Sequence, residues 1–314
     1  MKIKIISFFS CLLVLSSINA FSYQYPTPEY RLYRMDKFSI NGALGYLGGE
    51  SNEYVYTQYG QTLSQLNWHI NSAPIVKGEI NMDFLPWLSG NVNGWSTMDT
   101  GKAKMDDYDW MNPSQSKWTH WSHHEDTDLN NAYNFDLNLR GWFLQSQQYK
   151  IGLTGGYQQE QFDFSAKGGC YQYANGLYSG CFQNGLAMID YQQNFEATYL
   201  GLTGKYLMNN LELNATVKFS PWVHSNDVDE HYARNLTFTE EGLQSTFSSV
   251  TVGAGYFLSP FSQVFVEAAY NQFSNGKADT VINDNNGDYF LINNSAGLGN
   301  TNYTLALGLK YAAG

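Results

Sequence analysis

Hydrophobic and polar side chains alternate along several parts of the chain. From 211 to 219, apolar side chains interleave with glutamate, asparagine, threonine and lysine, and the same period of two occurs at 133–140, 264–271 and 303–311. Successive side chains of a β-strand point to opposite faces, so the pattern predicts strands with one apolar and one polar face. Each run has about 9 to 11 residues, the length that a tilted strand needs to cross a bilayer.

Two kinds of connection separate the predicted strands. Short turns are expected at 144–148, 208–210 and 259–262. Long polar segments lie at 100–131, 165–193, 224–246 and 272–300. Barrels of outer membranes have short periplasmic turns and longer outer loops, so the long segments are expected together on the outer side.

The first 20 residues have the pattern of a secretory signal peptide. Two lysines precede a short apolar run, Ile5–Leu15, and small residues follow it. Cleavage is predicted after Ala20, with Ser22 as the alternative, which leaves one mature domain over 21–314. The run is too short for a membrane helix, which needs about 20 apolar residues.

Composition favours a membrane barrel for this exported chain. Only 14% of the residues are charged, whereas 16% are aromatic and 24 are tyrosines. The expected fold is all-β: an antiparallel transmembrane β-barrel with a polar interior and an apolar outside. A secreted sandwich or propeller is the alternative, although its strands are usually nearer about five or six residues.

Cys170 and Cys181 remain after removal of the signal peptide. In an oxidising location they are expected to pair and to close a small loop. Two free thiols are the alternative.

Candidate chemistry lies in two acidic motifs of the long outer segments. Asp227, Asp229 and His231 share one face of an extended strand, and so do Asp107 and Asp109. Two carboxylates facing a carboxylate–imidazole pair could hold and activate a water molecule, with one pKa of the acid pair raised. Solvated loop acids without a function are the alternative.

A metal site is a further alternative for the same residues. Asp227, Asp229 and His231 could bind Ca²⁺ or Zn²⁺ together with His123 or His124. The preferred hypothesis has no metal cofactor.

Several motifs resemble those of the omptins, outer-membrane proteases of Gram-negative bacteria. They are DDYDWMN, WTHWSHH, NAYNFDLNLRGWF, GLTGKY and WVHSNDVDEHY, in family order. The resemblance runs from about Asn41 to Tyr311. It implies a ten-stranded barrel that extends beyond the outer membrane, a monomer whose active site faces outside. It also implies an aspartic-type endopeptidase that cleaves peptides and proteins at Arg or Lys.

The resemblance also assigns roles to residues of the two acidic motifs. Asp107 and Asp109 match the pair that positions water, and Asp229 and His231 match the opposing pair. His231 would accept the proton of the water, and Asp229 would orient the imidazole ring.

Other positions match accessory and substrate-binding residues of the family. Ser122 and His124 match an accessory Ser-x-His, which is not the nucleophile. Glu53 and Asp227 match the acids that bind the basic side chain before the scissile bond. The formal net charge of −11 would draw cationic peptides, and no nucleic-acid partner is expected.

Lipopolysaccharide, which the family requires, is the expected lipid partner. Its phosphates would lie at Gln161, Asn194 and Leu243, and none of these is basic. The sequence therefore indicates that the requirement is absent or that the lipid binds elsewhere.

Two other functions are open for such a barrel. A catalytically inactive barrel could be an adhesin or a structural protein. A diffusion pore is less favoured, because the predicted inward faces hold charges that could cross-pair and fill a narrow lumen. These charges are Asp136, Arg140, Glu212, Lys218 and Glu267.

Overall fold

The computed structural model describes residues 38–284 and 287–313, and most of these lie in β-strands. The strands are β1 Phe38–Tyr56, β2 Thr62–Leu85, β3 Leu88–Thr97, β4 Gly101–Asp109, β5 His120–Gln145, β6 Tyr149–Lys167, β7 Cys170–Tyr173, β8 Tyr178–Cys181, β9 Ala187–Met208, β10 Leu211–His231, β11 Leu236–Phe257, β12 Ser262–Asp284 and β13 Tyr289–Ala313. The predicted signal peptide and its cleavage sites lie outside the described residues.

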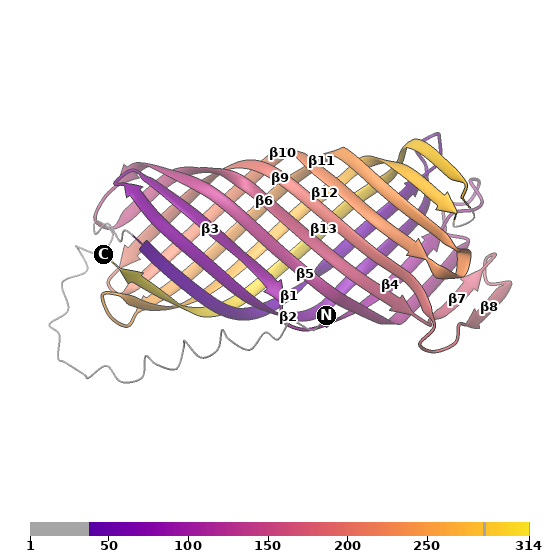
Figure 1. The fold of residues 1–314 in the computed structure, drawn as a ribbon, viewed down its shortest axis with the longest axis horizontal. Helices are drawn as coiled ribbons and strands as arrows, with labels where there is room; N and C mark the ends of the chain where they lie inside the picture. The colour runs from indigo at the N-terminus through magenta and orange to yellow at the C-terminus, as the bar shows by residue number, and fades with distance from the viewer. Residues whose placement is uncertain (1–37, 285–286, 314) are drawn as a thin grey trace.

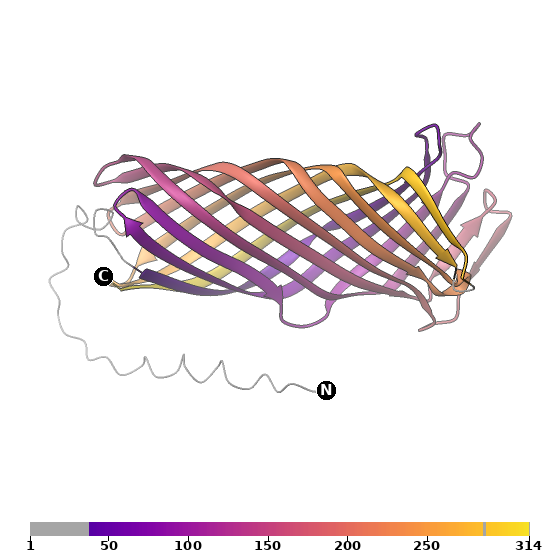
Figure 2. The same cartoon turned by 45° about the horizontal axis from the view of Figure 1, so that its top comes forward.

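The strands close into a ten-stranded antiparallel barrel, as expected (Figure 1). β1 pairs with β2 on one side and with β13 on the other. β3 and β4 act as two halves of one strand, because both lie between β2 and β5. β7 and β8 form a hairpin that extends from one end of the barrel (Figure 2).

A belt of exposed apolar side chains surrounds one half of the barrel. Leu305, Leu307 and Leu309 of β13 belong to this belt. Exposed tyrosines lie at its borders, among them Tyr303 and Tyr311, as in the interfacial girdles of membrane barrels. The belt therefore matches the alternating segments that the sequence predicts as membrane-crossing strands. In the described residues, no helix is long and apolar enough to cross a membrane.

The strands are about twice as long as their membrane-crossing parts. Nine of them run without interruption for 19 to 26 residues. The prediction that 100–131, 165–193, 224–246 and 272–300 are mainly loops is therefore wrong, because most of each segment lies in strands. The sheet continues to Asp109 and His231 and resumes at His120 and Leu236, β12 and β13 cover most of 272–300, and β6 to β9 cover most of 165–193. The short turns at 144–148, 208–210 and 259–262 are confirmed.

Charged side chains fill the lumen inside the belt. Lys218 contacts Asp136, and Lys77 contacts Glu267. The Lys310 ammonium lies 3.8 Å from a Glu212 carboxylate oxygen. Arg140 lies 3.8 Å from Glu79. These cross-lumen ion pairs confirm the predicted pairing and argue against an open pore.

Aromatic side chains fill the lumen above the belt. Trp68 stacks on Tyr191 with ring centroids 5.1 Å apart, and Phe195, Phe247 and Phe273 form a second stack. Both groups belong to buried apolar clusters. This packing fills the lumen beneath the outer end of the barrel.

Candidate active site

The inward row at the end of β10 contains Asp227, Asp229 and His231. All three are buried, whereas Val228 and Glu230 between them point outward. His231 Nε2 lies 2.6 Å from Asp229 Oδ2, so this nitrogen donates its hydrogen to the carboxylate. His231 Nδ1 is then left as the nitrogen that can accept a proton.

A bulge determines which side chains of β10 point inward. The register of β10 against β11 shifts between Ser220 and Val223. Within the membrane the even-numbered side chains such as Glu212 point inward, whereas above the bulge the odd-numbered ones do. Bulges re-aim side chains near functional sites in this way.

Asp107 and Asp109 point inward from the outer end of β4. The Ser64 hydroxyl lies 3.4 Å from Asp107 Oδ1. Asp107 keeps some solvent contact, but it lies deep among protein atoms, and this desolvation together with Asp109 raises its pKa to about 7. Desolvation also raises the pKa of Asp109. The acid pair can therefore keep a shared proton near neutral pH.

The two pairs approach each other from different walls of the barrel. A charge on His231 lowers the pKa of Asp107, and the charge on Asp229 raises it. Burial opposes a charge on His231, but the carboxylates of Asp229 and Asp107 outweigh this effect and raise its pKa above 6.5. The fold thus brings two pairs that are far apart along the chain near enough to change each other's pKa values.

Ser122 and His124 lie beside the acid pair, because Ser122 is the register partner of Asp107. The Ser122 hydroxyl lies 3.1 Å from His124 Nε2. The imidazole of His124 stacks on Phe182, and burial lowers its pKa. His124 is therefore neutral near pH 7 and can accept the Ser122 hydrogen.

The β7–β8 hairpin brings an aromatic side chain to the acid pair. A disulfide joins Cys170 to Cys181 across this hairpin. Burial, followed by the charges of Asp107 and Asp109, raises the pKa of Tyr173 on the hairpin. The disulfide thus constrains the β7–β8 hairpin, which carries Tyr173 near the acid pair.

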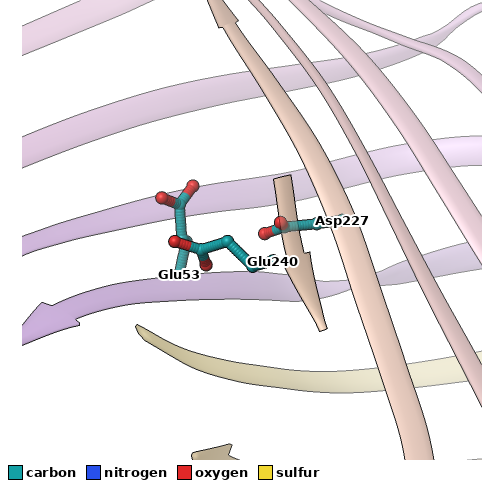
Figure 3. Close-up of side chains that lie close together, drawn as sticks. All are labelled: Glu53, Asp227 and Glu240. Carbon is teal, nitrogen blue, oxygen red and sulfur yellow. The ribbon is translucent and has the colours of Figure 1, made fainter. Parts of the chain in front are cut away.

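Glu240 on β11 is a further buried acid at this end of the barrel. Oxygens of Glu53, Asp227 and Glu240 lie within 4.8 Å of one another, and Figure 3 shows their carboxylates close together. We call these three residues the carboxylate cluster. Glu53 comes from β1, across the lumen from the other two.

Alternation along the sequence does not reveal Glu240. The register of β11 shifts between Gly242 and Ser245, so the inward side changes from Ser245 and Phe247 to Glu240. Without this bulge, the neighbouring Glu241 would be assigned inward. Two adjacent glutamates, Glu240 and Glu241, are the only feature of the sequence that could have pointed to an acid at this place.

The alternative metal site that includes His123 is not assembled. His123 points outward and contacts Asp106 at 2.9 Å and Glu125 at 3.0 Å. His124 uses Nε2 for its contact with Ser122, and in the described residues it does not lie at metal-ligand spacing from Asp227, Asp229 and His231. In the part of the chain that the structure describes, the carboxylate cluster is the one group with metal-ligand spacing.

The positions expected to contact lipopolysaccharide lie on the outer surface. Gln161 and Asn194 are register partners, and Leu243 is exposed. Asn194 donates a hydrogen bond of 3.1 Å to Asn226. Two of these side chains, Gln161 and Asn194, are polar and Leu243 is apolar, so none of the three is a cation.

Comparison with known proteins gives consistent results. Residues 34–313 match the model of the Omptin family. The chain is 44% identical over 279 residues to a plasminogen activator of Yersinia pestis, covering 88% of this chain and 89% of that protein. It is 40% identical over 299 residues to protease 7 of Escherichia coli K12, covering 91% of this chain and 94% of that protein. The crystal structure of the outer membrane protease OmpT of Escherichia coli superposes with a TM-score of 0.86 at 40% identity, over 88% of this chain and 97% of that one.

Proposed function

Since the chain belongs to the omptin family and is an outer-membrane protease, we propose that it is an endopeptidase that cuts beside arginine or lysine. We further propose that a water molecule is the nucleophile, activated by Asp229 and His231 opposite Asp107 and Asp109. The buried 2.6 Å contact between Asp229 and His231 is the observation that carries this proposal.

His231 is the proposed general base. With Nε2 bonded to Asp229, its Nδ1 accepts a proton from water as the water oxygen attacks the scissile carbonyl carbon. Asp229 keeps the ring in this tautomer and stabilises the imidazolium that forms. The burial of Asp229 supports these two roles, because water screens a buried charge less.

Asp107 and Asp109 are proposed to orient the water and to supply a proton. A pKa of about 7 for Asp107 supports a proton shared by the pair near neutral pH. When the carbon–nitrogen bond of the tetrahedral intermediate breaks, this proton passes to the leaving amine. The products are a new carboxylate and a free amino group, and His231 returns its proton to the acid pair through solvent.

Glu53 and Asp227 are proposed to bind the basic side chain on the amino-terminal side of the cut. Both are at most 2% exposed, and each has an oxygen without a hydrogen-bond partner. A guanidinium or ammonium group would satisfy these oxygens and offset the repulsion between them. Glu240 adds a third acid to the same place.

Orientation, oligomeric state and lipid contacts complete the proposal. The short turns lie at the end opposite Asp229, which supports an active site on the extracellular side. A closed ring leaves no unpaired strand edge in lipid, which supports a monomer. Because Gln161, Asn194 and Leu243 carry no charge, lipopolysaccharide would have to bind through other residues.

Cleavage of a quenched peptide with an Arg-Arg centre tests the proposal. Refolded wild-type protein with added lipopolysaccharide should cut between the arginines, and a matched Gln-Gln peptide should stay intact. His231→Ala should remove the activity, and Asp107→Asn should weaken it strongly. If wild type and variants are equally inert, the alternative of a catalytically inactive adhesin gains support.

A further inference from the structure

The carboxylate cluster lies within a continuous row of polar groups inside the barrel. Asp227 of β10 is the register partner of Gln193 on β9 and of Glu240 on β11. Thr280 of β12 follows Glu240 in the same row, and its hydroxyl donates a hydrogen bond of 3.0 Å to Glu240 Oε1. Glu53 closes the group from the opposite wall. Oxygens thus converge on one place from five strands.

Most of these oxygens have no partner within the protein. Glu53 Oε2, both Asp227 oxygens, Glu240 Oε2 and Gln193 Oε1 are buried without a hydrogen-bond partner in the described residues. The four side chains are at most 2% exposed. The Tyr191 phenol and the backbone N–H of Glu240 are near enough to lower the pKa of Asp227, but neither reaches hydrogen-bond geometry with its oxygens. Buried polar groups of native proteins rarely lack partners.

The electrostatics of the carboxylate cluster also favour a bound cation, because a cation offsets the repulsion among its acids once they ionise. Asp227 and Glu240 stand directly opposite each other on neighbouring strands, where like charges destabilise a sheet. Burial, followed by the neighbouring acids, raises the pKa of Glu53 and of Asp227 well above their usual values. No lysine or arginine of the described residues forms an ion pair with any of the three.

We propose that the carboxylate cluster of Glu53, Asp227 and Glu240 binds one Ca²⁺ ion, in competition with the basic side chain of the substrate. The binding site itself stands on geometry, and only the competition rests on the proposed function. The ion would inhibit the protease reversibly and would have no part in its chemistry.

The ligand set selects Ca²⁺ among common divalent cations. All the ligands are oxygens, which suit hard cations, whereas zinc sites usually include imidazole or thiolate. Oxygens up to 4.8 Å apart can share a centre at about 2.3 to 2.6 Å, the usual distance for Ca²⁺, while Mg²⁺ requires a smaller shell near 2.1 Å. Gln193 Oε1 is a further oxygen without a partner beside Asp227.

Terbium luminescence measures binding without any reference to activity. Tb³⁺ is the probe for Ca²⁺, and the stacked pair of Trp68 and Tyr191 near Asp227 can sensitise its emission. The full chain refolded in detergent should show saturable emission that Ca²⁺ displaces with a Kd of about 0.1–1 mM, the range of extracellular calcium modules. Emission that Ca²⁺ does not displace would overturn the proposal.

Matched variants locate the ion at the carboxylate cluster. Glu240→Gln keeps the shape of the side chain and should weaken Ca²⁺ displacement roughly tenfold or more, because one ligand charge is lost. Glu241→Gln is the control, since this neighbour points outward to His224. Equal binding by both variants would refute the site. Heat-modifiable mobility in SDS gels shows whether each barrel is folded, and Glu53→Gln gives a second test from another strand.

Steady-state kinetics test the competition. Ca²⁺ should raise the KM of the Arg-Arg peptide without changing kcat, and Glu240→Gln should lose most of this effect. If Tb³⁺ binds but no peptide is cut, the proposed function fails and the ion site stands. If the peptide is cut but Ca²⁺ neither binds nor inhibits, the ion site fails and the protease stands.

Discussion

Replacement of Asp229 by asparagine removes the charge that orients and stabilises the catalytic imidazole. Asp229 is 1% exposed, and its carboxylate lies 2.6 Å from His231 Nε2. Asparagine has nearly the same shape, so the barrel should still fold. The amide can also offer its hydrogen to Nε2, which would leave the hydrogen on Nδ1 and prevent proton acceptance there.

The size of the effect follows from the buried charge. Two unit charges 4 Å apart attract by about 4 kcal/mol at an effective dielectric constant near 20. Loss of about 3–5 kcal/mol of transition-state stabilisation corresponds to a fall of roughly 10²- to 10⁴-fold in kcat, the usual contribution of a general base. KM should change little, because the proposed contacts to the basic side chain come from Glu53 and Asp227.

Initial rates on the Arg-Arg peptide, with refolded protein and lipopolysaccharide, measure this effect. Glu230→Gln is the matched control, because Glu230 is the outward neighbour on the same strand, and it should keep wild-type kcat. A kcat of Asp229→Asn within about threefold of wild type would refute a role for this pair in proton transfer.

Further perturbations test other parts of the site. First, kcat/KM should rise with pH with a midpoint above 6.5, because Asp229 raises the pKa of His231 and the base must be neutral, and it should fall at higher pH as Asp107 and Asp109 lose their shared proton; a rise with a midpoint near 5 would contradict this. Second, Glu53→Gln should lower kcat/KM for the Arg-Arg peptide by at least about 30-fold, mostly through KM, since a buried partner of the substrate charge is lost. Third, reduction of the hairpin disulfide should lower local stability by about 3 kcal/mol, and limited chymotrypsin digestion should then cut the β7–β8 hairpin faster; an unchanged cutting rate would count against the role of the disulfide. Fourth, Glu240 has a folded pKa of about 8 against 4.5 for an ordinary glutamate, so its stabilising effect is complete below about pH 4.5 and is lost as pH rises through 8; Tm in detergent should fall between pH 5 and 8, and less steeply in Glu240→Gln.

The sequence predicts the membrane-crossing half of the fold well. Leu305, Leu307 and Leu309 alternate with inward side chains without interruption, so period two is sufficient to find the strand and its lipid face. The sequence is a poorer guide to the half of the barrel above the membrane. There the strands carry polar side chains on the outside as well, and the contrast that marks a strand in lipid disappears. Segments such as 272–284 therefore look like loops.

Bulges explain why the site is only partly predictable. The row Asp227, Asp229 and His231 is readable because the three follow one another on an uninterrupted part of β10. The inward position of Glu240 cannot be read from the sequence, because a register shift lies between Glu240 and the membrane segment of β11. This shift exchanges the inward and outward sides of the strand. The approach of β4 to β10 depends on ring closure, which no local pattern contains. The residues alone could only suggest that Asp107 faces His231, and the resemblance to a family was needed to assign the pairing.

A crystal structure of the wild-type protein at near-neutral pH, at a resolution that locates solvent, tests the central claim most directly. We expect one ordered water within hydrogen-bond distance of both His231 Nδ1 and an oxygen of Asp107 or Asp109. If these side chains lie more than about 10 Å apart, so that no single water can bridge them, hydrolysis by a water held among the four groups is contradicted.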